Sequence, residues 1–494
     1  MSNLRYAEAA RPRVLIIGFG HSGLCLGIAL KKAGIHSFTI LEKCERLGGT
    51  WRDNVYPGAA CDSPAFAYCF SFEQKTDWSR KWAFQSEILD YMQLCAEKYG
   101  LLPHTHFGRE VASARFDEEA GVWRVRTVSG NEYEAEYLIS SVGQLNRPSV
   151  PAIPGLERFQ GAKFHSARWD HGVNLTGKTV ACIGNAASAI QFVPEIAKQL
   201  EKLHIFQRSA NWMMPKFDRE FSESEKRRFT RVPLLAKLYR CWIWLSFELT
   251  WPIFRGVRWM SKRLERLAVR EMRKVIKDPE LQEALIPDYP IGGKRILISD
   301  DYYQTLNREN VEVVLDEIDH LTEDAVVTKN GTEVHVDVVI LATGFESTSF
   351  LAPMHLEGLA RRSLQKEWEN GAQAYLGMTH PGFPNFFMTY GPNTNLGHNS
   401  ILFMIECQTR YILDCIRQAT KRRLRFIDLR QDVLDRYNRD IQRELAGTVW
   451  TATDHSWYKN DAGRITNNWS GPTIRYWWKT RNADLRMYHL AKRG

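Results

Sequence analysis

The sequence predicts an α/β protein built around two parallel sheets. Two apolar, β-branched runs, at residues 14–17 and 179–183, each end in a turn of small residues that opens an alanine-rich helical pattern. A third apolar run, within residues 336–346, has the continuous character of a buried strand. Strands that alternate with helices in this way are typical of α/β folds. The 494 residues are enough for two or three domains.

The first run leads into the motif Gly18-Phe19-Gly20-His21-Ser22-Gly23, and the strand after its helix ends at Glu42. Strand, glycine turn, helix, strand and terminal acid together are the context of a dinucleotide-binding motif. Gly18 permits the tight turn, Gly20 lets the backbone approach a pyrophosphate, and Gly23 lets helix and strand pack closely. The helix N-terminus faces the phosphates, and Glu42 accepts hydrogen bonds from a ribose diol. We therefore expect a Rossmann-like domain here.

The segment LGGTWRDNVYPGAACD, residues 47–62, favours FAD over NAD at this first site. Gly48 and Gly49 allow the backbone to contact a cofactor, and Trp51 offers a flat apolar surface. Asp62 is an acid in a segment otherwise short of charge. A turn or capping role is the alternative interpretation of Asp62.

A second Rossmann-like unit follows at Gly184-Asn185-Ala186-Ala187-Ser188-Ala189. Alanine at the third motif position is a known variant, but Ala186 at the second position turns a Cβ toward the pyrophosphate. That Cβ weakens tight binding without affecting the fold. Arg208 stands where an NAD site carries an acid, and a guanidinium suits a 2′-phosphate. This favours NADPH, and a surface arginine at a strand end is the alternative.

Between the two units lies FQGAKFHSARWD, which contributes Phe159, Gly161, His165, Trp169 and Asp170. Together with Gly49, Trp51, Tyr56-Pro57-Gly58 and Asp62, this segment resembles both fingerprints of the type I Baeyer–Villiger monooxygenases, the cyclohexanone and phenylacetone monooxygenase-like flavoproteins of the flavin-containing monooxygenase superfamily. The resemblance runs from about residue 12 to the GPNTNLGHNS stretch near residue 400. Without it, the residues indicate only a flavoprotein oxidoreductase with two dinucleotide sites.

The resemblance implies an enzyme that uses NADPH to reduce FAD. The reduced flavin then forms a C4a-peroxyflavin with O2, which inserts one oxygen atom next to the carbonyl of an apolar ketone and gives an ester or lactone. S- or N-oxygenation by the protonated peroxide is the first alternative. A plain NADPH-dependent flavin oxidoreductase is the second, and a binding protein that has lost catalysis is the third. The absence of C-x-x-C and C-x4-C argues against a disulfide oxidoreductase.

The resemblance also implies roles for individual residues. Arg295 is expected to stabilise the peroxide anion and its ketone adduct, Asp62 to orient Arg295, and Lys294 to bind the 2′-phosphate together with Arg208. His165 is expected to couple domain rotation to cofactor position, with Phe159 and Trp169 packed across the domain seam. A static interdomain histidine is the alternative. The other expected cofactor contacts are Thr50, Tyr68, Val111, Ile401, Asn185, Ala187, Ser188 and Ser209.

The resemblance and the composition divide the chain into five parts. These are a first FAD-binding segment (1–147), a first NADP-binding segment (148–215), a helical insertion (216–290), a second NADP-binding segment (291–335), and a second FAD-binding segment with a C-terminal cover (336–494). The insertion is rich in Trp, Leu and Arg. We interpret it as a lid over the active site, and contact with a membrane surface is the alternative. His398 is interpreted as part of a helix-capping loop rather than as a catalytic base.

Charge and cysteine content limit the remaining possibilities. Residues 216–290 hold 17 Lys and Arg against 11 Asp and Glu, which is two thirds of the net charge of +9. Solvated helix faces explain this excess better than nucleic-acid binding. The nine cysteines are scattered, which indicates reduced thiols in a cytoplasmic protein and no metal site. The chain shows no signal peptide and no membrane span. The ketone and the oligomeric state stay open.

Overall fold

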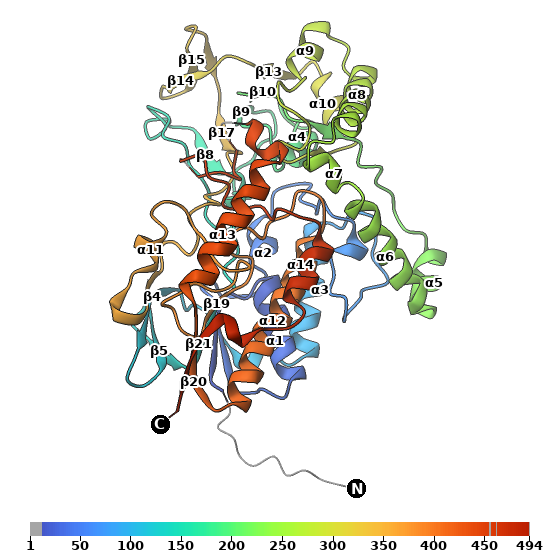
Figure 1. The fold of residues 1–494 in the computed structure, drawn as a ribbon. Coiled ribbons are helices and arrows are strands. Elements are labelled where there is room, and N and C mark those ends of the chain that lie inside the picture. Colours follow the sequence, from blue (N-terminus) through green and yellow to red (C-terminus); the bar gives the residue numbers. More distant parts are fainter. Residues whose placement is uncertain (1–11, 454–455, 461, 494) are drawn as a thin grey trace.

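The computed structural model describes residues 12–453, 456–460 and 462–493. The two expected Rossmann-like units form a lower and an upper part of the molecule in Figure 1, and the predicted fold class is confirmed. Residues 1–11, to which the expectation about a signal peptide applies, lie outside the described ranges. No helix of the described residues is long and apolar enough to cross a membrane.

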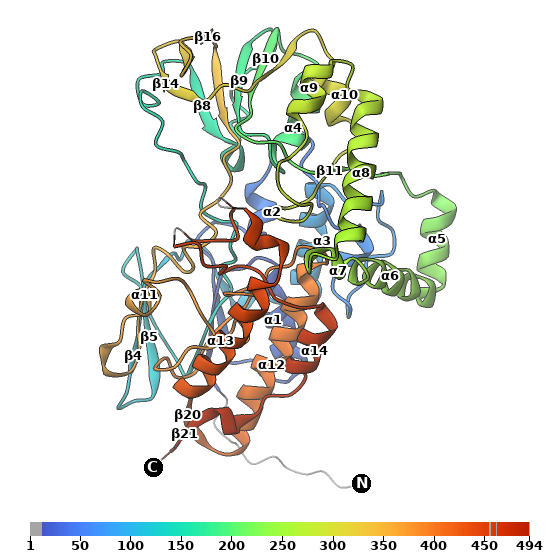
Figure 2. The ribbon, with the colours of Figure 1, turned by 45° about the horizontal axis from the view of Figure 1, so that its top comes forward.

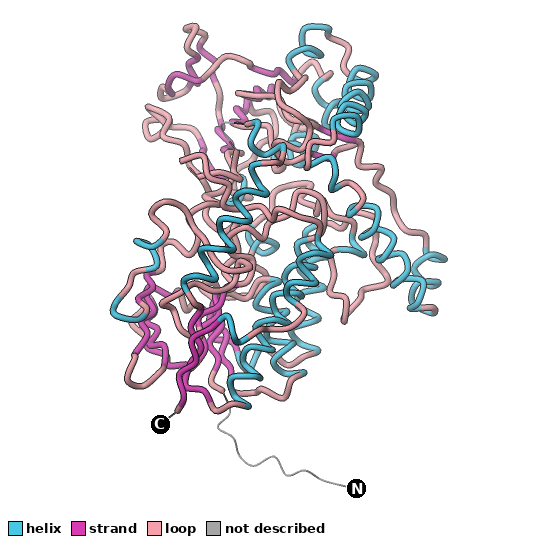
Figure 3. Tube along the Cα trace, viewed as in Figure 1, coloured by secondary structure: helices cyan, strands magenta, loops and turns pink. Residues whose placement is uncertain are grey.

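The lower unit is built on a parallel sheet of order β19-β7-β1-β2-β3. Side chains alternate between its two faces: Val14 and Ile16 of β1 join the core beneath the helices, whereas Leu15 and Ile17 join the core beneath a mixed sheet. Figure 3 shows strands gathered on one side of this unit and helices on the other. The sheet strands are β1 (Val14–Ile17), β2 (Phe38–Leu41), β3 (Thr105–His106), β7 (Tyr137–Ser140) and β19 (Phe386–Met388).

Helices and a second sheet cover the two faces of the lower sheet. The helices are α1 (His21–Lys32), α2 (Thr50–Asp53), α3 (Gln85–Lys98), α12 (Ile401–Lys421), α13 (Gln431–Ala446) and α14 (Thr473–Thr480). The second sheet contains β4 (Val111–Asp117), β5 (Val122–Thr127), β6 (Glu132–Ala135) and β18 (His355–Glu357), with α11 (Leu364–Glu367) beside it. The strands β20 (Leu424–Leu429) and β21 (Tyr488–Lys492) pair near the C-terminus.

The upper unit is a second parallel sheet, of order β13-β10-β9-β17-β8. Val180 and Cys182 of β9 face the helices, and Ala181 and Ile183 face a small antiparallel sheet. The strands of the parallel sheet are β8 (Ala162–His165), β9 (Thr179–Ile183), β10 (Lys202–Phe206), β13 (Val311–Val314) and β17 (Val338–Leu341). The helices of this unit are α4 (Ala189–Ile196) and α10 (Tyr302–Leu306). The small antiparallel sheet consists of β14 (Ile318–Leu321), β15 (Ala325–Thr328) and β16 (Glu333–His335).

Two expectations about the upper unit are corrected. The segment 159–170 is not only a linker, because its residues Ala162–His165 form the edge strand β8. The expected boundary at residue 336 is also wrong, because β17 pairs in parallel with both β9 and β8 and therefore belongs to the upper sheet. The chain returns to the lower unit only after Leu341, the last residue of β17.

The insertion consists of five helices, which run along one side of both units in Figure 2. They are α5 (Glu223–Arg231), α6 (Pro233–Glu248), α7 (Trp251–Phe254), α8 (Arg258–Val275) and α9 (Pro279–Ala284), flanked by the paired strands β11 (Met213–Met214) and β12 (Leu297–Ile298). Arg240 anchors α6 to the lower unit, since its Nη1 donates to the carbonyl oxygens of Phe66 (2.8 Å) and Cys69 (2.6 Å).

Candidate functional site

A cavity of about 1620 Å³ lies where the loops of the two units meet. The turns that follow β1 and β9 both line it, at the carboxyl ends of the two parallel sheets, which is where α/β folds bind ligands. Of the predicted cofactor and catalytic residues, all except Gly23 line this cavity.

Gly18 and Gly23 of the first turn lie where a side chain would collide with neighbouring backbone atoms. Gly18 has φ +100°, and a Cβ there would lie 2.7 Å from the carbonyl oxygen of Ser141. A Cβ on Gly23 would lie 2.0 Å from the carbonyl oxygen of Gly18, so Gly23 serves the packing of α1 on β1. The backbones of Gly20 and Gly49 are in contact, with a Cβ on Gly49 only 3.2 Å from the Cα of Gly20. Both residues line the cavity, and backbone without side chains suits a pyrophosphate there.

Glu42 is buried and accepts hydrogen bonds from three donors within the protein. Its Oε2 accepts from the backbone N–H of Phe19 (2.9 Å), and its Oε1 accepts from the N–H of Cys44 (3.0 Å) and from Nη1 of Arg52 (2.8 Å). Burial alone would lower the pKa of Arg52, but Asp53 and Glu42 raise it above its ordinary value. Glu42 therefore ties the glycine turn to a buried arginine, a role that the sequence did not indicate, while its carboxylate still lines the cavity.

An aromatic pair stands beside the glycine turn. The indole Nε1 of Trp51 donates to the hydroxyl oxygen of Tyr68 at 3.1 Å, and the two rings meet edge to face at 5.5 Å. Trp51 is buried, and both residues line the cavity. Thr50, Val111 and Ile401 line the same part. These side chains give the lower end of the cavity a mostly apolar wall, which suits a flat ring system.

Asp62 and Arg295 form an ion pair between the two units. Asp62 lies in the loop after α2, and Arg295 lies two residues before β12. Burial alone would lower the pKa of Arg295, but the Asp62 carboxylate and the hydroxyls of Tyr458 and Tyr390 raise it above its ordinary value. The guanidinium is therefore a fixed positive charge at the cavity wall, and Asp62 sets its position.

Two cations meet at the upper end of the cavity. Nζ of Lys294 donates to Oγ of Ser209 at 3.1 Å, and burial together with the nearby charge of Arg208 lowers the pKa of Lys294. Among the residues that the structure describes, neither cation has an ion-pair partner. Two like charges held close, with no carboxylate in an ion pair with either of them, indicate a site for a multiply charged anion such as a phosphate group.

The second turn is shaped by its glycine and by an asparagine. Gly184 has φ +106°, and a Cβ there would lie 2.6 Å from the carbonyl oxygen of Ala342. Nδ2 of Asn185 donates to Oε1 of Gln207 (2.7 Å) and to the carbonyl oxygen of Ser209 (3.1 Å), which ties the turn to the strand end that carries Arg208. Ala186, Ala187 and Ser188 complete the wall, and Ala186 is exposed.

None of the fingerprint residues 159–170 lines the cavity. Phe159 lies in a core of the upper unit, and Trp169 lies in a second core against which Val55 and Tyr56 of the lower unit also pack. His165 is buried, and its Nδ1 accepts from the N–H of Ala167 at 3.0 Å within its own segment. Burial lowers the pKa of His165, so the ring is neutral near pH 7. Asp170 is exposed and caps a local turn at the N–H of Gly172.

A second polar bridge between the two units is made by Gln191 of α4, which the sequence did not indicate. Its Oε1 accepts from the hydroxyl of Tyr56 (3.0 Å) and the N–H of Ala60 (3.1 Å), and its Nε2 donates to the carbonyl oxygen of Ala60 (3.1 Å). Gly58 allows this approach, because a Cβ there would lie 2.6 Å from the carbonyl oxygen of Gln191. The Tyr-Pro-Gly turn is thus the part of the lower unit that docks on α4.

His398 lies in an apolar wall of the cavity. Its ring centroid is 5.1 Å from that of Trp251 and 5.8 Å from that of Phe254. Burial lowers the pKa of His398 to about 3, and neither ring nitrogen has a hydrogen-bond partner among the described residues. A neutral, weakly basic imidazole is a poor general base near pH 7, which agrees with the structural interpretation of His398.

Comparisons with known proteins agree with this geometry. The family model "Flavin-binding monooxygenase-like" matches residues 11–367. A Baeyer–Villiger monooxygenase of Pseudomonas aeruginosa is 42% identical over 98% of this chain and 92% of its own. A steroid monooxygenase bound to NADP superimposes with a TM-score of 0.87 at 28% identity, over 98% of this chain and 100% of that one. The OTEMO complex with FAD and NADP gives 0.86 at 26% identity, over 97% and 99%.

We predict that buried histidines make the protein less stable in acid. Burial lowers the pKa of both His21 and His398 to about 3, whereas an unfolded histidine titrates near 6.5. The unfolded state therefore binds more protons below pH 6.5, and the free energy of unfolding falls as the pH falls toward 3. In His398→Leu this slope should be smaller by about 1.4 kcal/mol per pH unit between pH 6 and 4. Urea unfolding at several pH values measures it, and equal slopes in both proteins would contradict the assignment.

Proposed function

Because the chain belongs to the flavin-binding monooxygenase-like family and is an FAD- and NADPH-dependent monooxygenase of the Baeyer–Villiger type, we propose that it oxidises an apolar ketone to an ester or lactone with one oxygen atom of O2. One observation carries the proposal for this chain: the Asp62–Arg295 pair holds a permanent cation at the cavity wall between the two units. The bound FAD supplies the reaction of reduced flavin with O2.

We propose that each cofactor binds at its own end of the cavity. The backbone of Gly18, Gly20 and Gly49 would hold the FAD pyrophosphate, with Trp51 and Tyr68 beside the ring system. Asn185, Ala187 and Ser188 would hold the NADP pyrophosphate in the same way. Arg208 and Lys294 would bind the 2′-phosphate together with the Ser209 hydroxyl, because neither cation has an ion-pair partner among the described residues.

Arg295 is proposed as the residue that favours ketone oxidation. A fixed cation lowers the energy of negative charge on nearby oxygen atoms, both on the oxygen donor before attack and on the carbonyl oxygen during addition. It therefore keeps the donor deprotonated and nucleophilic. Asp62 is a positioning residue, because its carboxylate fixes the guanidinium without itself carrying a proton. S- or N-oxygenation needs the protonated donor, which a neighbouring cation disfavours.

An apolar part of the cavity wall supports an apolar substrate. Phe247, Ile253, Phe254 and Leu264 of the insertion line the cavity together with Leu396. Burial of apolar substrate surface against such side chains contributes about 25 cal/mol per Å². We propose that these residues are the substrate wall, which makes the inner side of the insertion the lid favoured from the sequence.

The first test replaces Arg295. The Arg295→Ala variant should bind FAD and be reduced by NADPH at the normal rate, but should form ester at least about 100-fold more slowly, as is typical for loss of a fixed charge-stabilising donor. Arg295→Lys keeps a cation and is the matched control. The measurement is mass-spectrometric detection of ester labelled from 18O2 against NADPH consumed. An unchanged ester yield in Arg295→Ala would refute the role of Arg295.

The second test concerns the choice of nicotinamide cofactor. In Arg208→Ala the KM for NADPH should rise by about tenfold or more, since a charge-assisted hydrogen bond contributes about 1.5–3 kcal/mol, while the KM for NADH stays nearly constant. Arg158→Ala, an exposed arginine outside the cavity, is the control. Steady-state kinetics of flavin reduction with both cofactors provides the comparison. A parallel change in both KM values would mean that Arg208 does not contact the 2′-phosphate.

A further inference from the structure

The outer side of α6 carries a continuous row of exposed apolar side chains. Leu234, Leu238, Trp242, Leu245 and Leu249 recur every three or four residues, so they lie on one side of the helix, and Leu234, Trp242 and Leu249 are each more than 60% exposed. Leu235 and Cys241 belong to the same side. We call these seven residues the α6 face. Single exposed apolar residues are ordinary, but a continuous row of this kind marks a binding surface.

Exposed apolar side chains are concentrated around this helix. Of the nineteen large hydrophobic residues that are exposed in the described part of the chain, nine lie within residues 232–267. Besides six members of the α6 face they are Val232, just before α6, and Trp259 and Leu267 of α8. Two of the nine are tryptophans, a residue type enriched where proteins meet the headgroup region of a bilayer.

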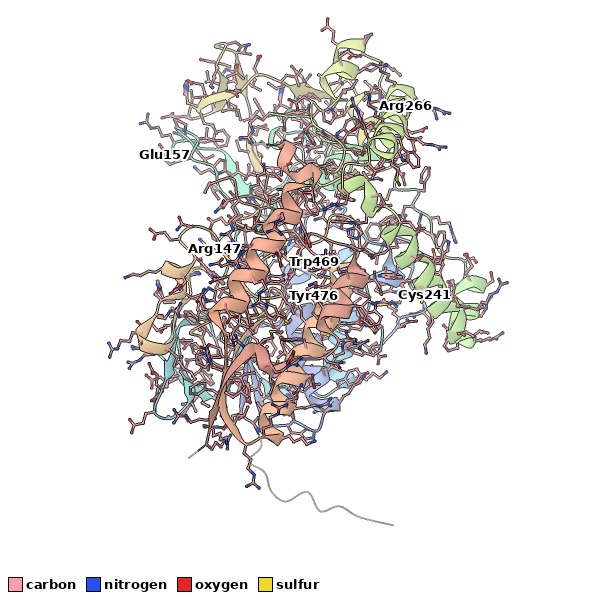
Figure 4. All side chains as sticks on the ribbon, in the orientation of Figure 1. Arg147, Glu157, Cys241, Arg266, Trp469 and Tyr476 are labelled. Atoms are coloured by element: carbon pink, nitrogen blue, oxygen red, sulfur yellow. The ribbon has the colours of Figure 1, made fainter. Side chains whose placement is uncertain are left out.

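The exposed charges on α6, α7 and α8 and in the loops between them have a single sign. Between residues 227 and 277 all thirteen exposed charged side chains are cations: Arg227, Arg228, Arg231, Lys237, Arg255, Arg258, Lys262, Arg263, Arg266, Arg270, Arg273, Lys274 and Lys277. The three carboxylates of this stretch are half-buried and already bonded, Glu248 to Thr473, Glu265 to the N–H of Ile291, and Glu271 to Lys274. Figure 4 labels Cys241 of α6 and Arg266 of α8 on the same side of the molecule.

The other side of α6 is part of the active-site wall. Ala236 and Ile243 are buried, Arg240 is bonded to the lower unit, and Phe247 lines the cavity. The C-terminal end of α6 therefore has solvent on one side and the cavity with its proposed substrate wall on the other. A molecule held at this end of the α6 face is separated from the cavity by the thickness of one helix.

We propose that the α6 face docks on an anionic phospholipid bilayer. The leucines and Trp242 enter the boundary between headgroups and acyl chains, and the surrounding cations contact lipid phosphates. A second copy of this chain is a poorer occupant, because a two-fold dimer through this face would bring the cations of both copies together. The docked position lets an apolar ketone pass from the membrane to the cavity. This last step rests on the proposed function, whereas docking itself does not.

Binding is tested with the FAD-loaded full chain and vesicles. The protein should sediment with phosphatidylcholine vesicles that contain about 30% phosphatidylglycerol, and should bind at least about tenfold more weakly to pure phosphatidylcholine or at high salt. Cys241 is the one exposed cysteine among those described, so it can carry an environment-sensitive fluorophore. Its emission should shift to shorter wavelength on binding, and Cys241→Ser is the labelling control.

A pair of matched variants separates the α6 face from the rest of the surface. Leu238 and Val128 are aliphatic residues that are 56% and 68% exposed, and Val128 follows β5 on the opposite side of the molecule from α6 in Figures 1 and 2. Leu238→Glu should lose vesicle binding by about tenfold or more, and Val128→Glu should keep it. Both should oxidise a short-chain, water-miscible ketone at the wild-type rate, so a failure of docking and a failure of the proposed function are distinguishable.

Several results would overturn the proposal. Absence of co-sedimentation at low salt would do so, and so would equal vesicle binding by Leu238→Glu and the wild type. A concentration-dependent dimer that Leu238→Glu abolishes would show that a second copy covers the face. Binding of a single-stranded oligonucleotide that Leu238→Glu abolishes, without any binding of vesicles, would show that the surface recognises nucleic acid.

Discussion

The ion pair between Asp62 and Arg295 is the interaction on which the proposed chemistry depends. Its two members come from different units, one from the loop after α2 and the other from the segment before β12. The cation therefore stands in the correct place only when the two units are correctly seated on one another. The three hydrogen bonds of Gln191 to the Tyr56–Ala60 turn hold that seating from the neighbouring helix α4. Cofactor binding and the position of the fixed charge therefore both depend on how the two units pack on one another.

The parts that could be predicted from the sequence are those set by local backbone constraints. Gly18 and Gly184 both adopt positive φ and both meet a backbone carbonyl where a Cβ would stand, so their motifs identify the two turns and the strands before them. The predicted cofactor residues on those turns then line one cavity. Arg295 and Lys294 could be found only through the family resemblance, because a Lys-Arg pair is common on surfaces.

The parts that were missed depend on contacts between residues far apart in the chain. The strand pairing of β8 with β17 joins residue 162 to residue 338, and nothing local indicates it. The same holds for Gln191, because its role depends on the Tyr-Pro-Gly turn, which is far from it in the sequence and lies against it in the fold. Arg52 is half of a buried ion pair with Glu42, although arginine usually remains exposed. Phe159 was assigned to the seam, yet its apolar surface is buried within the upper unit.

The central claim is that Asp62 acts through Arg295, and a double-mutant cycle tests it most directly. The rate of ester formation would be measured in the wild type, Asp62→Ala, Arg295→Ala and the double variant, all loaded with FAD and supplied with NADPH. Residues that act as one unit give strongly non-additive losses. The account predicts that the double variant is no slower than Arg295→Ala alone. Independent, multiplicative losses would contradict it and would give Asp62 a separate role in the reaction.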